Sequence, residues 1–196
     1  MSITIKGAPA SPEQKKILRR AMQLADRWGA PYKAKVALVE ALIQESEAQN
    51  LSTPSSDGYG SYGVLQGLSR FHKHSDLMDP AYQIGVFLGK GRGGKRFPKG
   101  FTGKGNAISL AESGLRSGEI AQRVEGSAYP DRYQTSQKEA QRIVAALSGR
   151  QVTGGVSASR VDANVSRAGV SEANLVMRQQ ALQLYLSQRG RPGALL

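Results

Sequence analysis

The sequence predicts a mainly α domain with one short turn-rich or β-hairpin segment. Apolar residues recur at helical spacing along much of the chain up to Leu147, and several of these stretches follow helix-start signals. Strong strand alternation and internal repeats are both missing from the sequence. With 196 residues, of which 39% are hydrophobic, the chain can bury one ordinary core.

Composition divides the chain into four parts. Residues 1–10 are expected to form an N-terminal tail, and residues 11–148 a single domain. From position 149 the sequence is rich in Gly, Ser, Val and Arg, which predicts a linker over 149–170. Residues 171–196 form an amphipathic helix and tail in this scheme, able to pack on the domain or on a partner.

The first helix has a complete start signal. Ser11 is a suitable N-cap, Pro12 occupies the first helical position, and Gln14 is placed to close a capping box. The Gly-Ala-Pro sequence at 29–31 ends this helix and opens the next. The apolar residues at helical spacing are Ile17, Leu18, Ala21, Leu24, Ala25 and Trp28.

The second predicted helix, 32–48, carries several acids and amides. On a helical wheel Glu40, Gln44 and Glu47 share one polar arc, whereas Glu45 points about 160° away from Glu47 among apolar residues. Glu45 is then either a helix-end carboxylate with a buried stem or a carboxyl in a partly apolar pocket. Burial disfavours the charged form, so a carboxyl in such a pocket keeps a proton that it can donate.

The segment after this helix is rich in Ser, Gly, Pro and Asp. Residues 50–63 therefore predict turns or a short hairpin, and the glycines permit close approach of a ligand. The apolar spacing of "YGVLQGLSRF", 62–71, is expected to begin another helix. Residues 108–147 predict helix, turn and helix, with Ser117 as a cap, and a last core helix from Thr135 to Leu147.

The charge is strongly positive. Lys and Arg number 27 against 15 Asp and Glu, a net charge of +12, which favours a polyanionic partner: nucleic acid, an acidic membrane or an acidic cell-wall polymer. Residues 80–111 contain no acid, and residues 89–105 hold six basic residues and seven glycines. This cationic loop is either a solvated surface or a site for phosphate or carboxylate polymers.

Several other classes of function are disfavoured. The chain has no cysteine, and His72 and His74 lie among basic residues, so no metal and no cofactor are expected. Residues 84–95 combine a β-like apolar run with the glycine and lysine spacing of a phosphate-binding loop, but Arg96 stands where Ser or Thr must bind magnesium. No apolar run approaches the roughly 20 residues of a membrane span, and the N-terminus lacks a secretory signal.

Two short motifs carry a family resemblance. "ALIQES", 41–46, followed by "GSYGVLQ", 60–66, resembles the lysozyme-like superfamily, especially the soluble lytic transglycosylase and goose-type branches. Those families pair a helix-terminal Glu-Ser with a downstream Gly-apolar-apolar-Gln. "DPAYQIGVFL" and "IAQRVEGSAYPDRY" resemble parts of lysozyme-like domains from actinobacterial cell-wall enzymes and their phages, and the resemblance extends from Ser11 to Leu147.

The resemblance implies a lysozyme-like helical domain that cleaves the peptidoglycan backbone between N-acetylmuramic acid and N-acetylglucosamine. It makes Glu45 the catalytic acid and Ser46 the serine that supports it. Tyr129 and Tyr133 are assigned first to the core and second to the cleft. The residues implied to line the sugar cleft or to face the acid are Ser61, Tyr62, Gly63 and Gln66.

The second catalytic group is left open by the resemblance. Asp57 is the first candidate and Asp131 the second for a carboxylate that activates water or attacks the sugar. If neither reaches the cleft, the sugar's own 6-hydroxyl attacks, which is the lytic transglycosylase outcome. The sequence therefore predicts either a muramidase or a lytic transglycosylase.

The setting expected for such an enzyme is a phage. It would be a virion-associated lysin in the tail or capsid, with the C-terminal helix on a phage structural protein, or an endolysin in the host cytoplasm before lysis. The alternative is a non-enzymatic basic phage structural or DNA-packaging protein that keeps a lysozyme-like fold and binds phosphate through residues 89–105.

Overall fold

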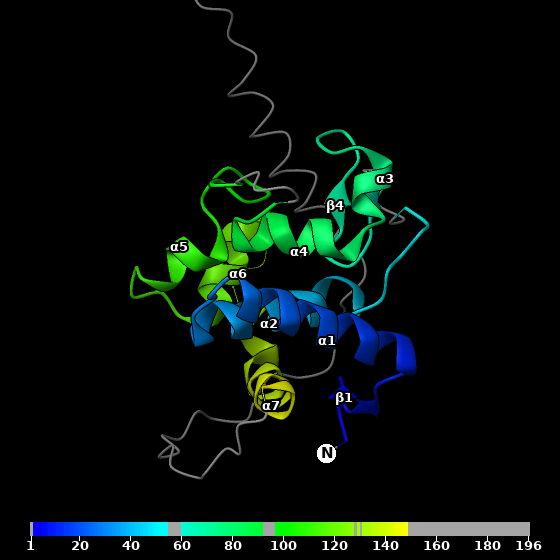
Figure 1. The fold of residues 1–196 in the computed structure, drawn as a ribbon, viewed down its shortest axis with the longest axis vertical. Helices are drawn as coiled ribbons and strands as arrows, with labels where there is room; N and C mark the ends of the chain where they lie inside the picture. The colour runs from blue at the N-terminus through cyan, green and yellow to red at the C-terminus, as the bar shows by residue number, and fades with distance from the viewer. Residues whose placement is uncertain (1, 55–59, 92–96, 128, 130, 149–196) are drawn as a thin grey trace, which may run out of the picture. The chain divides into compact units, whose positions relative to one another are not determined.

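The computed structural model describes residues 2–54, 60–91, 97–127, 129 and 131–148, all within the unit Met1–Val152. These residues are mainly helical, with two pairs of short antiparallel strands, which confirms the predicted fold class (Figure 1). The predicted linker and C-terminal helix lie outside the described residues. The α-helices are α1 Pro12–Arg27, α2 Tyr32–Ser46, α3 His74–Leu77, α4 Pro80–Leu88, α5 Ala107–Ala111, α6 Ser117–Glu125 and α7 Gln137–Leu147.

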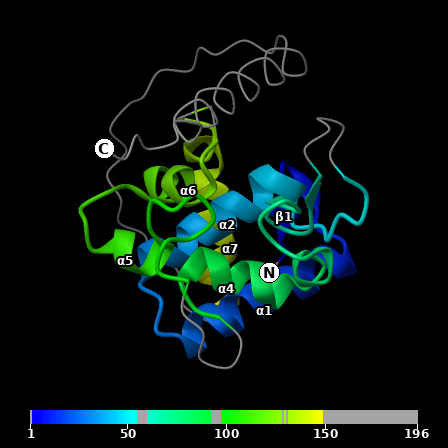
Figure 2. The same ribbon diagram turned by 90° about the horizontal axis from the view of Figure 1, so that it is seen from above.

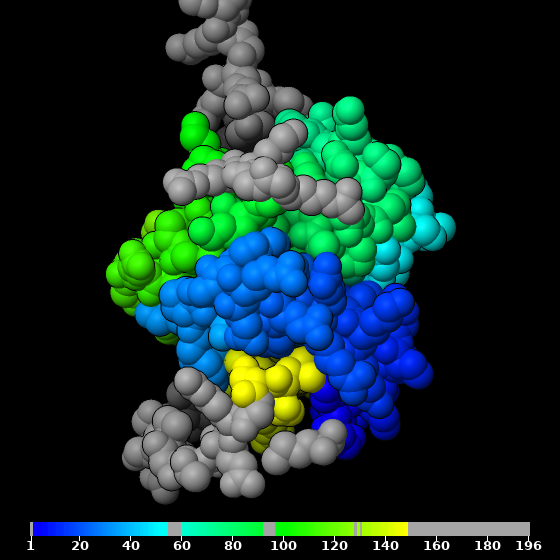
Figure 3. Space-filling view, in the orientation of Figure 1, coloured from blue at the N-terminus to red at the C-terminus, as the bar shows by residue number. Residues whose placement is uncertain are grey.

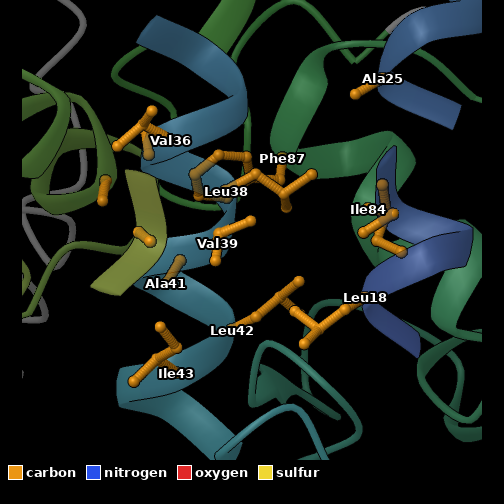
Figure 4. Close-up of a cluster of buried hydrophobic side chains, with 14 of the residues drawn as sticks. Leu18, Ala25, Val36, Leu38, Val39, Ala41, Leu42, Ile43, Ile84 and Phe87 are labelled. Atoms are coloured by element: carbon orange, nitrogen blue, oxygen red, sulfur yellow. The ribbon is translucent and has the colours of Figure 1, made fainter. Parts of the chain in front are cut away.

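Helix α2 is the central element. It packs against α1, α4, α5, α6 and α7, and every residue from Val36 to Ile43 is buried (Figure 2). Its apolar side chains point in several directions, toward Leu18 of α1 and toward Ile84 and Phe87 of α4 (Figure 4). Because neighbours surround α2, the predicted polar arc is wrong at Glu40, which is completely buried.

Helix α1 begins as predicted. Gln14 donates its main-chain N–H to Ser11 Oγ at 3.2 Å, and Ser11 donates its own N–H to Gln14 Oε1 at 2.7 Å. The apolar positions of α1 face the core, and its opposite side forms part of the front surface (Figure 3). The helix ends before Gly29, whose φ of +66° begins the turn into α2.

The N-terminal residues are part of the domain, which corrects the expected tail. Strands β1 Thr4–Ile5 and β2 Ala8–Pro9 pair antiparallel, and the side chains of Ile3 and Ile5 are buried. Lys6, in the turn, donates its main-chain N–H to Glu139 of α7 at 3.1 Å. The hairpin is therefore fastened to the last helix of the domain.

Helix α2 ends at Ser46, two residues before the predicted end. Glu47 and Ala48 both have left-handed backbones, with φ of 54° and 56°. Residues of α1 and of the N-terminal hairpin hold this turn. Gln14 donates its side-chain amide to the Glu47 carbonyl at 2.8 Å, and Lys6 Nζ lies 3.0 Å from the Glu47 carboxylate.

A hairpin follows, and it extends beyond residues 50–63, for which turns or a short hairpin were expected. Strands β3 Ser61–Tyr62 and β4 Gly67–Leu68 pair antiparallel around a turn at 63–66. The helix expected from Tyr62 is wrong, because Gly63 and Gln66 have positive φ values of 79° and 50° that a right-handed helix excludes.

Helices α4, α6 and α7 differ from the prediction in structure type or in where they begin. The "β-like" run at 84–88 is helical, since Asp79 caps α4 by accepting the N–H of Ala81 at 3.0 Å. Arg116, not Ser117, is the N-cap of α6. The last helix was expected from Thr135; a 3-10 turn, η2 Gln134–Ser136, comes first and α7 follows. Among the described residues, no helix is both long and apolar enough to span a membrane.

Candidate active site

Glu45 is the penultimate residue of α2, and only 5% of its side chain is exposed. The Tyr133 hydroxyl donates a hydrogen bond to Glu45 Oε1 at 2.5 Å, and Arg132 Nη1 lies 3.5 Å from the same oxygen. The acid selected by the helical wheel is thus enclosed, and one of its oxygens faces both a hydroxyl donor and a cation.

The segment between α6 and α7 supplies both partners, and the last turn of α2 holds this segment. Gln44 donates its side-chain amide to Thr135 Oγ1 at 3.1 Å and also to Ser136 Oγ. Arg132 donates through Nη2 to the Gln44 carbonyl. The positions of Arg132 and Tyr133 relative to Glu45 are therefore fixed by several contacts.

Tyr133 is fully buried. Burial raises the pKa of its hydroxyl well above the usual value, and the neighbouring charges of Glu45 and Glu125 raise it further. The hydroxyl therefore keeps its proton and remains a donor to Glu45. Glu125, the last residue of α6, is thereby placed close enough to Tyr133 for its charge to act on it.

Ser46 joins the end of α2 to the β3–β4 hairpin. Its hydroxyl donates to the Val64 carbonyl at 2.7 Å and lies 3.4 Å from the Leu42 carbonyl. The turn of the hairpin is thus fastened to the residue next to Glu45. Ser46 itself is buried, so its contacts are those of a supporting residue.

Gly63 has no room for a side chain. At its φ of +79°, an added Cβ would lie 2.0 Å from Gln83 Nε2 and 2.3 Å from the Leu77 carbonyl oxygen. Its N–H donates to the Leu51 carbonyl at 2.8 Å. Gln66 donates its side-chain amide to the Gly63 carbonyl at 2.9 Å and so spans the turn.

Gln83, a buried residue of α4, organises this turn from behind. Its Oε1 accepts the Leu65 N–H at 2.7 Å, and its Nε2 donates to the carbonyls of Tyr62 at 2.8 Å and Leu77 at 2.6 Å. The sequence offered one signal for this role, a lone amide inside the apolar run "YQIGVFL".

The aromatic and hydroxyl residues predicted for the cleft lie in different surroundings. Ser61 is buried in β3, and Tyr62 beside it is partly exposed, with its ring edge-on to that of His74 at 4.5 Å between centroids. Tyr129 is partly buried; its hydroxyl is buried and has no hydrogen-bond partner among the described residues.

The structure describes only one of the two candidates for a second carboxylate. Asp57 lies outside the described residues. Asp131 is exposed, and it acts on Arg116: a hydrogen bond with Glu119 chiefly, and the charge of Asp131 to a smaller extent, raise the pKa of Arg116.

The two histidines have aromatic neighbours. His72 Nδ1 lies 2.9 Å from the Tyr82 hydroxyl, and burial lowers the pKa of His72 although the charge of Asp76 opposes this. In the part of the chain that the structure describes, no three His, Cys, Asp or Glu residues are grouped so as to hold a metal ion.

Four residues that support the site were not selected from the sequence: Gln44, Gln83, Glu125 and Arg132. Arg132 lay within the quoted "SAYPDRY" motif, which is a local signal, whereas the roles of the other three depend on packing between helices.

A scan against protein-family models gives no match to this sequence, and a search of curated proteins gives none either.

Proposed function

We propose that this protein is a peptidoglycan glycosidase that cleaves between N-acetylmuramic acid and N-acetylglucosamine, with Glu45 as the general acid. The observation that carries the proposal is the enclosure of Glu45 at the end of the central helix, where Tyr133 and Arg132 hold one oxygen. The "ALIQES" and "GSYGVLQ" motifs support it, because Ser46 joins the first motif to Val64 in the second.

The chemistry needs a proton at the glycosidic oxygen, since a sugar alkoxide leaves poorly. A protonated Glu45 keeps its hydrogen bond from Tyr133, because Oε1 accepts while the proton is on Oε2. As the proton moves to the leaving oxygen, negative charge develops on the carboxylate. Tyr133 and Arg132 stabilise this charge, so their contacts strengthen toward the transition state.

The second group decides the product. Asp57 remains the proposed carboxylate for hydrolysis, and attack by the sugar 6-hydroxyl is the proposed route if Asp57 is dispensable. Reducing ends identify hydrolysis and anhydro ends identify transglycosylation. We place the enzyme in a phage virion, where residues 171–196 bind a structural protein and the net charge of +12 draws the enzyme to an anionic wall.

The test is release of soluble glycan fragments from purified peptidoglycan, with the product ends identified by mass. Wild type and Glu112→Gln are expected to release fragments, and Glu45→Gln to release none. Glu112 is a matched control, an exposed glutamate at the end of α5. Equal release by Glu45→Gln and wild type would exclude Glu45 as the acid.

The same proteins discriminate the non-enzymatic alternative. If wild type releases no fragment from any wall, and wild type and Glu45→Gln bind duplex DNA with equal, steeply salt-dependent affinity, the DNA-binding function replaces the proposed one.

A further inference from the structure

A second glutamate of α2 is buried more completely than the proposed acid. Glu40 has no exposed surface, and its Oε1 accepts a hydrogen bond from Ser117 Oγ at 2.8 Å. Gln137 donates its side-chain amide to the same Ser117 oxygen at 3.1 Å. Oε2 of Glu40 is buried and has no hydrogen-bond partner among the described residues.

Ser117, which bonds Glu40, and Gln137, which bonds Ser117, both stand at the start of a helix. Ser117 is the first residue of α6 and Gln137 the first residue of α7, and both helices pack against α2 (Figure 2). The stretch that runs from the end of α6 to the start of α7, 126–136, carries Arg132 and Tyr133. Glu40 therefore sits where the two helices that flank this segment meet α2.

We propose that Glu40 is a positioning residue which, through Ser117 and Gln137, holds segment 126–136 and its two site residues in place beside Glu45. The inference rests on the proposed function, and it adds a residue that acts through Ser117 and Gln137 rather than on the sugar. The C-terminal end of the segment adjoins Gln137, which is linked to Glu40 through Ser117. Within the segment, Tyr133 bonds to Glu45 and Thr135 to Gln44.

Ionisation gives this role a measurable signature. Burial raises the pKa of Glu40 from 4.5 to about 8, and the Ser117 hydrogen bond opposes the rise. The polar groups that face Glu40 are the Ser117 hydroxyl on α6 and the Gln137 amide behind it on α7. From α1, α4, α5 and η2, no charged group among the described residues shifts this pKa.

The direction in which the opening equilibrium changes with pH follows from proton binding at Glu40. In the closed domain Glu40 keeps its proton up to about pH 8, whereas a conformation that exposes it releases the proton above about pH 4.5. Opening of the segment therefore becomes more favourable by up to about tenfold per pH unit between these values, and levels off above pH 8.

The experiment is amide hydrogen exchange of peptides covering 126–136, from pH 5 to 9, corrected for the intrinsic exchange rate. In wild type and Glu112→Gln, the opening equilibrium is expected to rise with pH up to about 8. Glu40→Gln keeps an acceptor for Ser117 but cannot ionise, so its profile is expected to be flat. A flat wild-type profile, or a rise in Glu40→Gln equal to that of wild type, overturns the proposal.

Peptides from α1 supply the internal comparison. If residues 126–136 and α1 exchange with the same opening equilibrium at every pH, Glu40 acts only on global stability and the positioning role is refuted. The positioning role requires that the segment open more readily than α1.

A second variant covers the case in which Glu40→Gln does not fold. Ser117→Ala keeps the carboxyl and removes the hydrogen bond that lowers its pKa, so the levelling-off is expected at a higher pH than in wild type. No change in that pH overturns the assignment. Wall digestion by wild type tests the proposed function separately, because the exchange profile does not depend on catalysis.

Discussion

Replacing Gly63 by alanine tests how the hairpin is held beside Glu45. Gly63 and Gly103 have nearly the same φ, +79° and +81°, a region that strains alanine at either position. Their surroundings differ. A Cβ at Gly103 would meet nothing within 4 Å, whereas one at Gly63 would collide with Gln83 and the Leu77 carbonyl. Gly103→Ala is therefore a matched control for strain alone.

The magnitudes follow from these contacts. The left-handed backbone costs a non-glycine residue about 1–2 kcal/mol, which is the full effect expected for Gly103→Ala. In Gly63→Ala the Gln83 amide must also move, and this movement breaks its three hydrogen bonds to Tyr62, Leu65 and Leu77. At about 1 kcal/mol each, these add about 3 kcal/mol. Gly63→Ala is thus expected to lose about 4–5 kcal/mol of unfolding free energy.

Equilibrium unfolding in urea measures both variants against wild type. The difference between them, about 3 kcal/mol, isolates the collision from the strain. If the two variants lose the same free energy, Gln83 does not hold the turn in the way described. A Gly63→Ala protein that folds is also expected to release fewer wall fragments, because the turn fastened to Ser46 has shifted.

Three further outcomes are expected. Tyr133→Phe removes the hydrogen bond that the Tyr133 hydroxyl donates to Glu45, so urea unfolding should show a loss of about 1–3 kcal/mol and fragment release should fall; unchanged release would remove Tyr133 from the site. Between pH 5 and 8 the unfolding free energy of wild type should fall relative to Glu40→Gln by up to about 1.4 kcal/mol per pH unit, because the folded state alone retains the proton; parallel curves would contradict the burial of Glu40. Ser11→Ala should cost about 1 kcal/mol in thermal unfolding and Ser11→Asn much less; equal losses would show that the cap is dispensable.

Local signals explain what the sequence predicted well. The start of α1 is marked by Ser11, Pro12 and Gln14, which lie within four positions of one another and are therefore visible in the sequence. The end of α2 was misplaced by only two residues, because nothing in "ESEA" marks Glu47 and Ala48 as left-handed.

A helical wheel cannot show that a helix such as α2 is buried on all sides. The wheel assumed that α2 has a solvent face and assigned Glu40 to it, whereas α6 and α7 cover that face. The same packing explains Ser117: its hydroxyl serves Glu40 rather than the end of its own helix.

Short apolar runs were ambiguous for a related reason. "YGVLQGLSRF" has helical spacing, but its backbone is decided by Gln83, which lies in another helix and bonds to Tyr62 and Leu65. "IGVFL" looked like a strand but is helical, because it continues the helix α4 that Asp79 caps at its start. For the site, the wheel and the motifs selected Glu45, and the motif "SAYPDRY" placed Tyr133 near it without indicating their contact.

The contact between Tyr133 and Glu45 spans 88 positions of the chain, and that between Ser117 and Glu40 spans 77. Helices α1 and α2, by contrast, are neighbours in sequence and in space. During synthesis the first two helices therefore emerge long before the partners of Glu45, and closing the long loop costs chain entropy that only late contacts repay. Under the proposed function, N-terminal fragments that stop before Tyr133 do not cleave the wall. Cleavage appears only when α7 has packed against α2.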